Sequence, residues 1–214
     1  RSLLYYGEWA EAEIEILKTV LNVGDHVLDI GANQRLLGKI DIEPLQRRIS
    51  QQTEETWAEQ KLRQQNYEVH RDTQSIVLLF CDEDWPRSGE IYKDTGYDRL
   101  ADVAEPLMAQ IINAAYDKGG LIIRAMAARL KPGGKIPAHR DSIHSFHISH
   151  RIHVPIMSNA GVRFTVGGKP YIFEPGYAYE INNQRKHSVM NLGNEDMITF
   201  IFDYVPPIEL KTGL

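Results

Sequence analysis

Short apolar runs separated by turn-forming residues fill the C-terminal part of the chain. The runs are LIIRAMAARL (121–130), RIHVPIM (151–157), VRFTV (162–166), YIF (171–173), YAYEI (177–181) and MITFIFDYV (197–205). They end at Gly-, Pro-, Asn- or Ser-rich turns such as Lys-Pro-Gly-Gly. Short strands with turns about every 8–12 residues are typical of a β-sandwich or barrel, not of a parallel sheet. We therefore expect an antiparallel β-domain here.

Helical spacing dominates the region before residue 120. Residues 41–65 predict one or two helices, with Pro44 near a first turn and Thr53 as an N-cap. Residues 74–80 predict a strand, 81–99 a loop, and 100–116 a helix that ends before Lys118-Gly119-Gly120. Helices first and strands last indicate an α+β, mainly β, fold in which the helices buttress one sheet.

Residues 1–33 differ from the rest. Trp9, Ile14 and Leu17 lie near helical spacing, and a turn at Gly24-Asp25 precedes a short apolar run that ends in DIGAN. A helix, a turn and a strand ending in glycine is how a nucleotide-binding α/β unit begins. The segment resembles the start of FkbM-type S-adenosylmethionine methyltransferases, but no alternating strand–helix series follows. We expect an appendage without a bound nucleotide.

Composition narrows the classes of function. The chain has 214 residues, 43% of them apolar and 25% charged, which is typical of a globular protein. A formal charge of −5 argues against nucleic-acid binding. No apolar run approaches the roughly 20 residues of a membrane span. The single cysteine, Cys81, excludes an internal disulfide and fits a reducing compartment, so we expect a cytoplasmic protein.

The sequence PAHRDS places His139 and Asp141 two residues apart. On an extended segment, residues i and i+2 point to the same side, so the imidazole and the carboxylate can converge. His187, which follows several predicted strands, is the candidate for a third ligand, because a jelly roll brings such distant strands side by side. Two histidines and one carboxylate form the facial triad of non-haem Fe(II) oxygenases, which leaves open positions on the metal.

The remaining histidines have weaker claims to a chemical role. His144, His147 and His150 occupy a polar segment where both solvated and substrate-facing roles are open. His26 and His70 have no carboxylate or histidine at a useful spacing.

Four segments give a specific family resemblance. They are PGGKIPAHRD (132–141), RIHVPI (151–156), GYAYEINNQRKHSVMN (176–191) and FIFDYVPP (200–207). With them, residues 36–214 resemble the aspartyl/asparaginyl β-hydroxylase family of oxygenases. The resemblance implies a double-stranded β-helix fold (a cupin-like jelly roll). It further implies an enzyme that uses Fe(II), 2-oxoglutarate and O2. It also implies that His139, Asp141 and His187 are the iron ligands.

By the same resemblance, Arg151 and His153 lie beside 2-oxoglutarate. The residue types suit this role, because a guanidinium can grip a carboxylate through two hydrogen bonds and an imidazole can donate a third. The two side chains alternate on one strand so that both face inward.

One position departs from the family pattern. The family usually carries an arginine ten residues after the distal histidine, where it pairs with the far carboxylate of 2-oxoglutarate, and Met197 occupies that position here. A buried carboxylate without a partner is unfavourable. Arg129 and Arg163, on neighbouring predicted strands, are the candidates to replace the missing cation.

These features predict an Fe(II)- and 2-oxoglutarate-dependent dioxygenase. Its substrate would be a C–H bond of an amino acid, a peptidyl side chain or another small metabolite. The alternative is a jelly-roll binding module that retains the metal site but is catalytically weakened. A methyltransferase is a second alternative, which rests on residues 1–33 alone.

Overall fold

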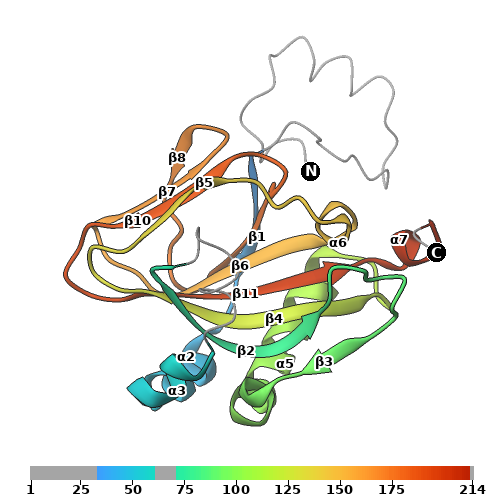
Figure 1. Cartoon of the computed structure of the whole chain (residues 1–214), viewed down its shortest axis with the longest axis horizontal. Helices are drawn as coiled ribbons and strands as arrows, with labels where there is room; N and C mark the ends of the chain where they lie inside the picture. The colour runs from blue at the N-terminus through green and yellow to red at the C-terminus, as the bar shows by residue number, and fades with distance from the viewer. Residues whose placement is uncertain (1–32, 61–70, 213–214) are drawn as a thin grey trace.

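Two antiparallel β-sheets face each other, and helices cover the outer face of the larger sheet (Figure 1). The computed structural model describes residues 33–60 and 71–212, so the expectation for the N-terminal appendage lies outside the described residues except at Asn33. The larger sheet has the order β1-β9-β6-β11-β4-β2-β3, and the smaller one β5-β10-β7-β8.

The strands of the larger sheet are β1 (Gln34–Lys39), β2 (Thr73–Cys81), β3 (Ile91–Lys93), β4 (Leu121–Leu130), β6 (His150–Met157), β9 (Tyr177–Ile181) and β11 (Met197–Val205). Those of the smaller sheet are β5 (Lys135–His139), β7 (Val162–Val166), β8 (Lys169–Tyr171) and β10 (His187–Asn191). The long strand β11 lies in the middle of the larger sheet, between β6 and β4.

Local sequence signals account for the helices, which are α2 (Glu43–Ser50), α3 (Glu54–Glu59), α5 (Thr95–Ala115), α6 (His144–Ile148) and α7 (Pro207–Thr212). As predicted, Pro44 lies in the first turn of α2, and the Thr53 hydroxyl caps α3 by accepting from Thr56 N at 3.3 Å. The Asp94 carboxylate caps α5 by accepting from Thr95 N at 2.6 Å.

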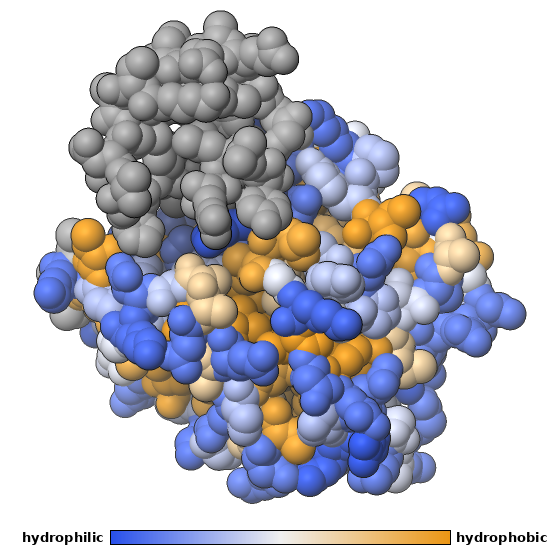
Figure 2. Space-filling model, turned by 180° about the vertical axis from the view of Figure 1, so that it is seen from behind, coloured by the Kyte–Doolittle hydropathy of each residue, from blue (hydrophilic) through white to orange (hydrophobic). Residues whose placement is uncertain are grey.

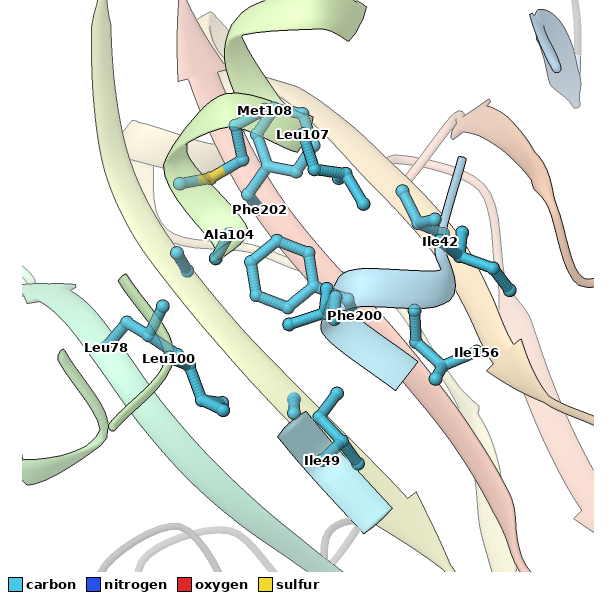
Figure 3. Packing of buried hydrophobic residues seen from close by; sticks show 14 of the residues in the cluster. Ile42, Ile49, Leu78, Leu100, Ala104, Leu107, Met108, Ile156, Phe200 and Phe202 are labelled. Carbon is cyan, nitrogen blue, oxygen red and sulfur yellow. The ribbon is translucent and has the colours of Figure 1, made fainter. Parts of the chain in front are cut away.

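The main hydrophobic core lies between α2, α5 and the larger sheet. Because side chains alternate along a strand, Phe200 and Phe202 of β11 both point toward the helices. They meet Leu107 and Met108 of α5, as Figure 3 shows. Gly96 lets α5 approach β2 closely, since a Cβ there would lie 2.3 Å from the Val77 carbonyl oxygen.

A second core lies between the two sheets. It joins Leu130, Tyr179 and Ile181 of the larger sheet to Phe164 and Val189 of the smaller one, and other members include Val166 and Phe173. Met197 packs against this cluster. The two sheets are therefore packed face to face around an apolar interior.

This architecture confirms the predicted α+β, mainly β, jelly-roll fold with buttressing helices. The sheets are antiparallel and not closed into a barrel. The prediction of a loop over 81–99 was wrong in part, because β3 lies within it and α5 already begins at Thr95. The short strands β1, β5 and β10 were also missed, since each is defined by its pairing more than by its apolar pattern.

The surface is mixed in character. In Figure 2, apolar residues gather in the middle of the face shown, bordered by hydrophilic ones. Among the described residues, no helix combines the length and the apolar character that crossing a membrane would need.

The packing of α5 gives a stability prediction. Leu100 is fully buried in the main core, so Leu100→Ala should lower the free energy of unfolding by about 2–5 kcal/mol. Leu121 is 43% exposed, and Leu121→Ala should change the free energy by no more than about 0.5 kcal/mol. Urea unfolding followed by circular dichroism measures both values. Equal effects of the two substitutions would contradict the assignment of Leu100 to the core.

Candidate metal centre

Three potential metal ligands converge at one end of the smaller sheet. His139 ends β5, His187 begins β10, and the two residues are cross-strand partners. Asp141 follows β5 by two residues. One donor atom from each of the three residues lies within 4.8 Å of the other two. The structure thus brings together the three residues that the sequence singled out.

Backbone carbonyl groups orient both imidazole rings. His139 Nδ1 lies 2.9 Å from Pro137 O, and His187 Nδ1 lies 3.1 Å from Arg185 O. A carbonyl oxygen can only accept a hydrogen bond, so each Nδ1 carries the proton and donates. In the neutral ring this leaves the lone pair on Nε2, as metal coordination requires.

Asp141 is held by the fold on one side and free on the other. Its Oδ2 accepts a hydrogen bond from Arg151 Nη1 at 2.7 Å. Its backbone N donates to Asn183 O at 3.1 Å, which fixes the loop after β5. The other carboxylate oxygen, Oδ1, lies 3.8 Å from His139 Nε2 and points to the space that the histidines share.

A buried charge network lies directly behind Asp141. Arg151 donates from Nε and Nη2 to the two oxygens of Asp203, each at 2.8 Å. Arg124 Nη1 lies 3.6 Å from Asp203 Oδ2, and Arg124 Nη2 donates to Ser145 Oγ at 2.9 Å. Asp203 is fully buried, so this carboxylate depends on both guanidinium groups for compensation.

Helix α6 covers the two arginines. The Phe146 ring lies 4.3 Å from Arg151 Cζ and 4.5 Å from Arg124 Cζ, measured to the ring centroid. A guanidinium over an aromatic face gains electrostatic attraction while it is shielded from water. Gln184 holds α6 in place by donating to Phe146 O at 3.2 Å.

Burial keeps two histidines of this region neutral. It lowers the pKa of His187, and the neighbouring His139 and Arg151 lower it further, although Asp141 opposes them. Burial, followed by Arg151 and His187, holds the pKa of His153 well below its ordinary value of 6.5. Burial alone would lower the pKa of Arg151, but Asp141 and Asp203 outweigh it and raise that pKa.

The donor set fits iron. Two imidazole nitrogens and one carboxylate oxygen match the facial triad of non-haem Fe(II) sites. The three ligands of a facial triad lie at about right angles, so metal–ligand bonds of about 2.0–2.2 Å place their donor atoms roughly 3 Å apart. The donor atoms lie within 4.8 Å of one another. Metal binding would therefore draw them together by up to about 2 Å.

The other predicted site residues are divided between the space enclosed by the two sheets and the outer faces of the sheets. Arg151 and His153 face the interior, as expected, but Arg151 is engaged by Asp141 and Asp203 instead of being left for a ligand. His153 stands edge-on to Phe164, with ring centroids 5.7 Å apart.

Arg129 and Arg163 are not in the interior, which corrects the expectation that one of them replaces the missing cation. Leu130 and Phe164 point inward, so strand alternation sends their neighbours Arg129 and Arg163 outward. Arg129 pairs with Glu54 at 2.6 Å and lies over the Trp57 ring on the helix-covered face. Arg163 is exposed and donates to the Ala160 and Val162 carbonyls.

The remaining described histidines lie outside the triad. His144 and His147 are exposed on α6, and His150 Nδ1 lies 2.6 Å from Glu180 Oε1. His26 and His70 lie outside the described residues.

Sequence reasoning missed Asp203, Arg124 and Phe146. A signal was present for Asp203, because it is the only charged residue in the apolar run MITFIFDYV. A lone carboxylate on a strand buried on both faces requires a cation beside it. The role of Phe146 depends on the short helix α6, which the sequence did not predict.

Comparison with known proteins gives one family. The model of the aspartyl/asparaginyl beta-hydroxylase family matches residues 39–207. The search of curated proteins finds no match.

Similar solved structures include an oxidoreductase of the 2OG-Fe(II) oxygenase family from Burkholderia pseudomallei (14% identity, 64% of this chain and 69% of that one, TM-score 0.48). Another is the viral collagen prolyl hydroxylase of Paramecium bursaria Chlorella virus-1 (9% identity, 66% and 83%, TM-score 0.39). A third is a cupin 2 conserved barrel domain protein from Salinispora arenicola (13% identity, 42% and 67%, TM-score 0.31).

The triad gives a metal-binding prediction. His187→Ala should weaken Fe(II) binding by at least about a hundredfold, because it removes a ligand that no other described side chain replaces. The matched control is His147→Ala, which removes an exposed imidazole of α6 and should leave the affinity unchanged. Anaerobic calorimetric titration measures both. Equal losses would show that the triad is not the binding site.

The neutral histidines predict an acid-sensitive fold in the metal-free protein. Since the folded-state pKa values of His153 and His187 are lowered, the unfolded chain takes up protons first as the pH falls. Stability should therefore fall below pH 6.5, by up to about 1.4 kcal/mol per pH unit for each proton. His153→Gln should reduce this slope. Urea unfolding between neutral pH and pH 5 measures it, and an unchanged slope would contradict the assignment.

Proposed function

The chain belongs to the aspartyl/asparaginyl β-hydroxylase family, and we propose that it is an Fe(II)-dependent oxygenase that uses 2-oxoglutarate or a related 2-oxo acid. Its product would carry a hydroxyl group in place of a hydrogen on carbon. The convergence of His139, Asp141 and His187 on one point carries this proposal. Three protein ligands on one side of a metal leave the other side for a 2-oxo acid and O2.

Bound iron, with the 2-oxo acid and O2, would supply the oxidising chemistry, and the protein would supply ligands, orientation and a dry site. His139 and His187 present Nε2 because backbone carbonyls hold their Nδ1 protons. Arg151 holds one oxygen of Asp141 and leaves the other for the metal. Phe146 shields the guanidinium groups behind the site from water.

The substrate that we propose is an amino acid, a peptidyl side chain or another small metabolite, and not a nucleic acid. The net charge of −5 supports the exclusion of nucleic acid. We also propose a cytoplasmic location. The cysteine content supports it, because Cys81 is the single cysteine of the chain and no internal disulfide can form.

The alternative function is a binding module that holds metal without turnover. Met197 favours this alternative, because a methionine at the interior face of β11 cannot pair with a carboxylate. The two functions differ in what happens to a 2-oxo acid once metal and O2 are present.

Release of carbon dioxide from 2-oxo acids tests the proposed function. The Fe(II)-loaded protein should release labelled carbon dioxide from the first carbon of at least one acid in a panel that includes 2-oxoglutarate. His187→Ala should abolish this release, and His147→Ala should retain it. Metal binding without release from any acid in the panel would favour the binding module.

A further inference from the structure

The interior beyond the metal centre has an uncharged surface. Its lining on three strands of the larger sheet includes six inward-facing side chains: Met126 and Ala128 of β4, His153 of β6, and Met197, Thr199 and Ile201 of β11. Arg124 and Arg151 face the same interior, but both lie at the metal end and are engaged by Asp203. Among the described residues, this surface therefore carries no cation away from the metal end.

The space in front of this surface is accessible. Ala128, Ile201 and Met197 lie in the larger sheet and face the smaller one, yet each remains partly exposed. Ile201 lies two residues from Asp203 along β11, which is roughly 7 Å. A molecule held at the metal centre therefore has the Ile201 end of this surface beside it, together with His153, the cross-strand partner of Ile201.

Two buried polar atoms on this surface have no hydrogen-bond partner. They are His153 Nε2 and Thr199 Oγ1, on side chains that are 7% and 4% exposed. The two residues are diagonal neighbours on adjacent strands, because His153 is paired with Ile201. Buried polar groups normally have hydrogen-bond partners. Two such atoms without a partner that face the same space therefore indicate a site that a ligand completes.

The chemistry of this site is neutral hydrogen bonding. Thr199 has a hydroxyl group, and His153 is buried beside Arg151, which disfavours a charged imidazole. The other four side chains of this surface, Met126, Ala128, Met197 and Ile201, are apolar. The nearby Arg151 is already bound to Asp141 and Asp203, so a second carboxylate placed here would lose its water without gaining a free cation.

We propose that the interior of this chain selects a 2-oxo acid with an uncharged tail, and that Met197, Thr199 and His153 determine this specificity. The inference rests on the proposed function, because it concerns the 2-oxo acid of the same metal centre. It narrows the chemical class of that acid and assigns a role to two otherwise unpaired buried atoms.

Anaerobic calorimetric titration of the Fe(II)-loaded protein tests the proposal. The two probes are 2-oxoglutarate and 5-methyl-2-oxohexanoate, in which two methyl groups replace the oxygens of the far carboxylate. The acid with the uncharged tail, 5-methyl-2-oxohexanoate, should bind about 10- to 100-fold more tightly than 2-oxoglutarate. This is the range expected when a buried charge lacks its partner. The 5-methyl ester of 2-oxoglutarate, which is neutral at the same end but polar, should lose affinity in Thr199→Val.

Met197→Arg should reverse the preference. The substitution places a cation among the six interior side chains, so it should tighten the binding of 2-oxoglutarate about 10- to 100-fold. It should also weaken the binding of 5-methyl-2-oxohexanoate. The matched control is Met190→Arg, which adds the same charge on β10 at a side chain that is 42% exposed. This control should change neither affinity. The wild-type comparison stands even if Met197→Arg does not fold.

The outcomes separate this inference from the proposed function. If wild-type protein binds 2-oxoglutarate as tightly as the neutral acid or more tightly, the inference is overturned and the oxygenase proposal stands. If the Fe(II)-loaded protein binds neither acid, both the inference and the use of a 2-oxo acid are overturned.

Discussion

The contact between Arg151 and two carboxylates connects the candidate metal centre to the fold. One guanidinium joins Asp141, which lies in a loop, to Asp203, which lies in the central strand β11. Removing one partner from a buried ion pair costs about 3–5 kcal/mol, because the other charge stays buried. Arg151 is therefore needed by the fold as well as by the site, and its carboxylate partners leave it little freedom to bind anything else.

The two faces of β11 have different roles: one forms the main core, and the other faces the space between the two sheets. Phe200 and Phe202 point toward α5 and form the main core, whereas Asp203 and Met197 point between the sheets. Because side chains alternate strictly along a strand, a shift of one residue would exchange the two sets. The large aromatic side chains of the helix face thus fix the register that places Asp203 behind Asp141.

The strands and the triad could be predicted from the sequence because each depends on a simple periodicity. His139 and Asp141 are two residues apart, and His187 follows several predicted strands that a jelly roll brings side by side. The short strands β5 and β10 could not be predicted, because pairing with each other stabilises them. The pairing of β10 with β5 is also irregular between His187 and Val189, which interrupts the two-residue alternation of side chains along β5. The inward or outward direction of Arg129 and Arg163 required knowledge of which neighbours, Leu130 and Phe164, enter the core.

Burial has two opposite consequences in this interior. It keeps His187 and His153 neutral, which prepares the first as a metal ligand and leaves the second as a hydrogen-bonding group. The same low polarity makes any anion without a cation unfavourable. The charges of Arg124 and Arg151 are already matched by Asp203 and Asp141. In the proposed oxygenase, a 2-oxo acid would be held by the metal, and the uncharged surface beside the site would discriminate by the charge of the acid's tail.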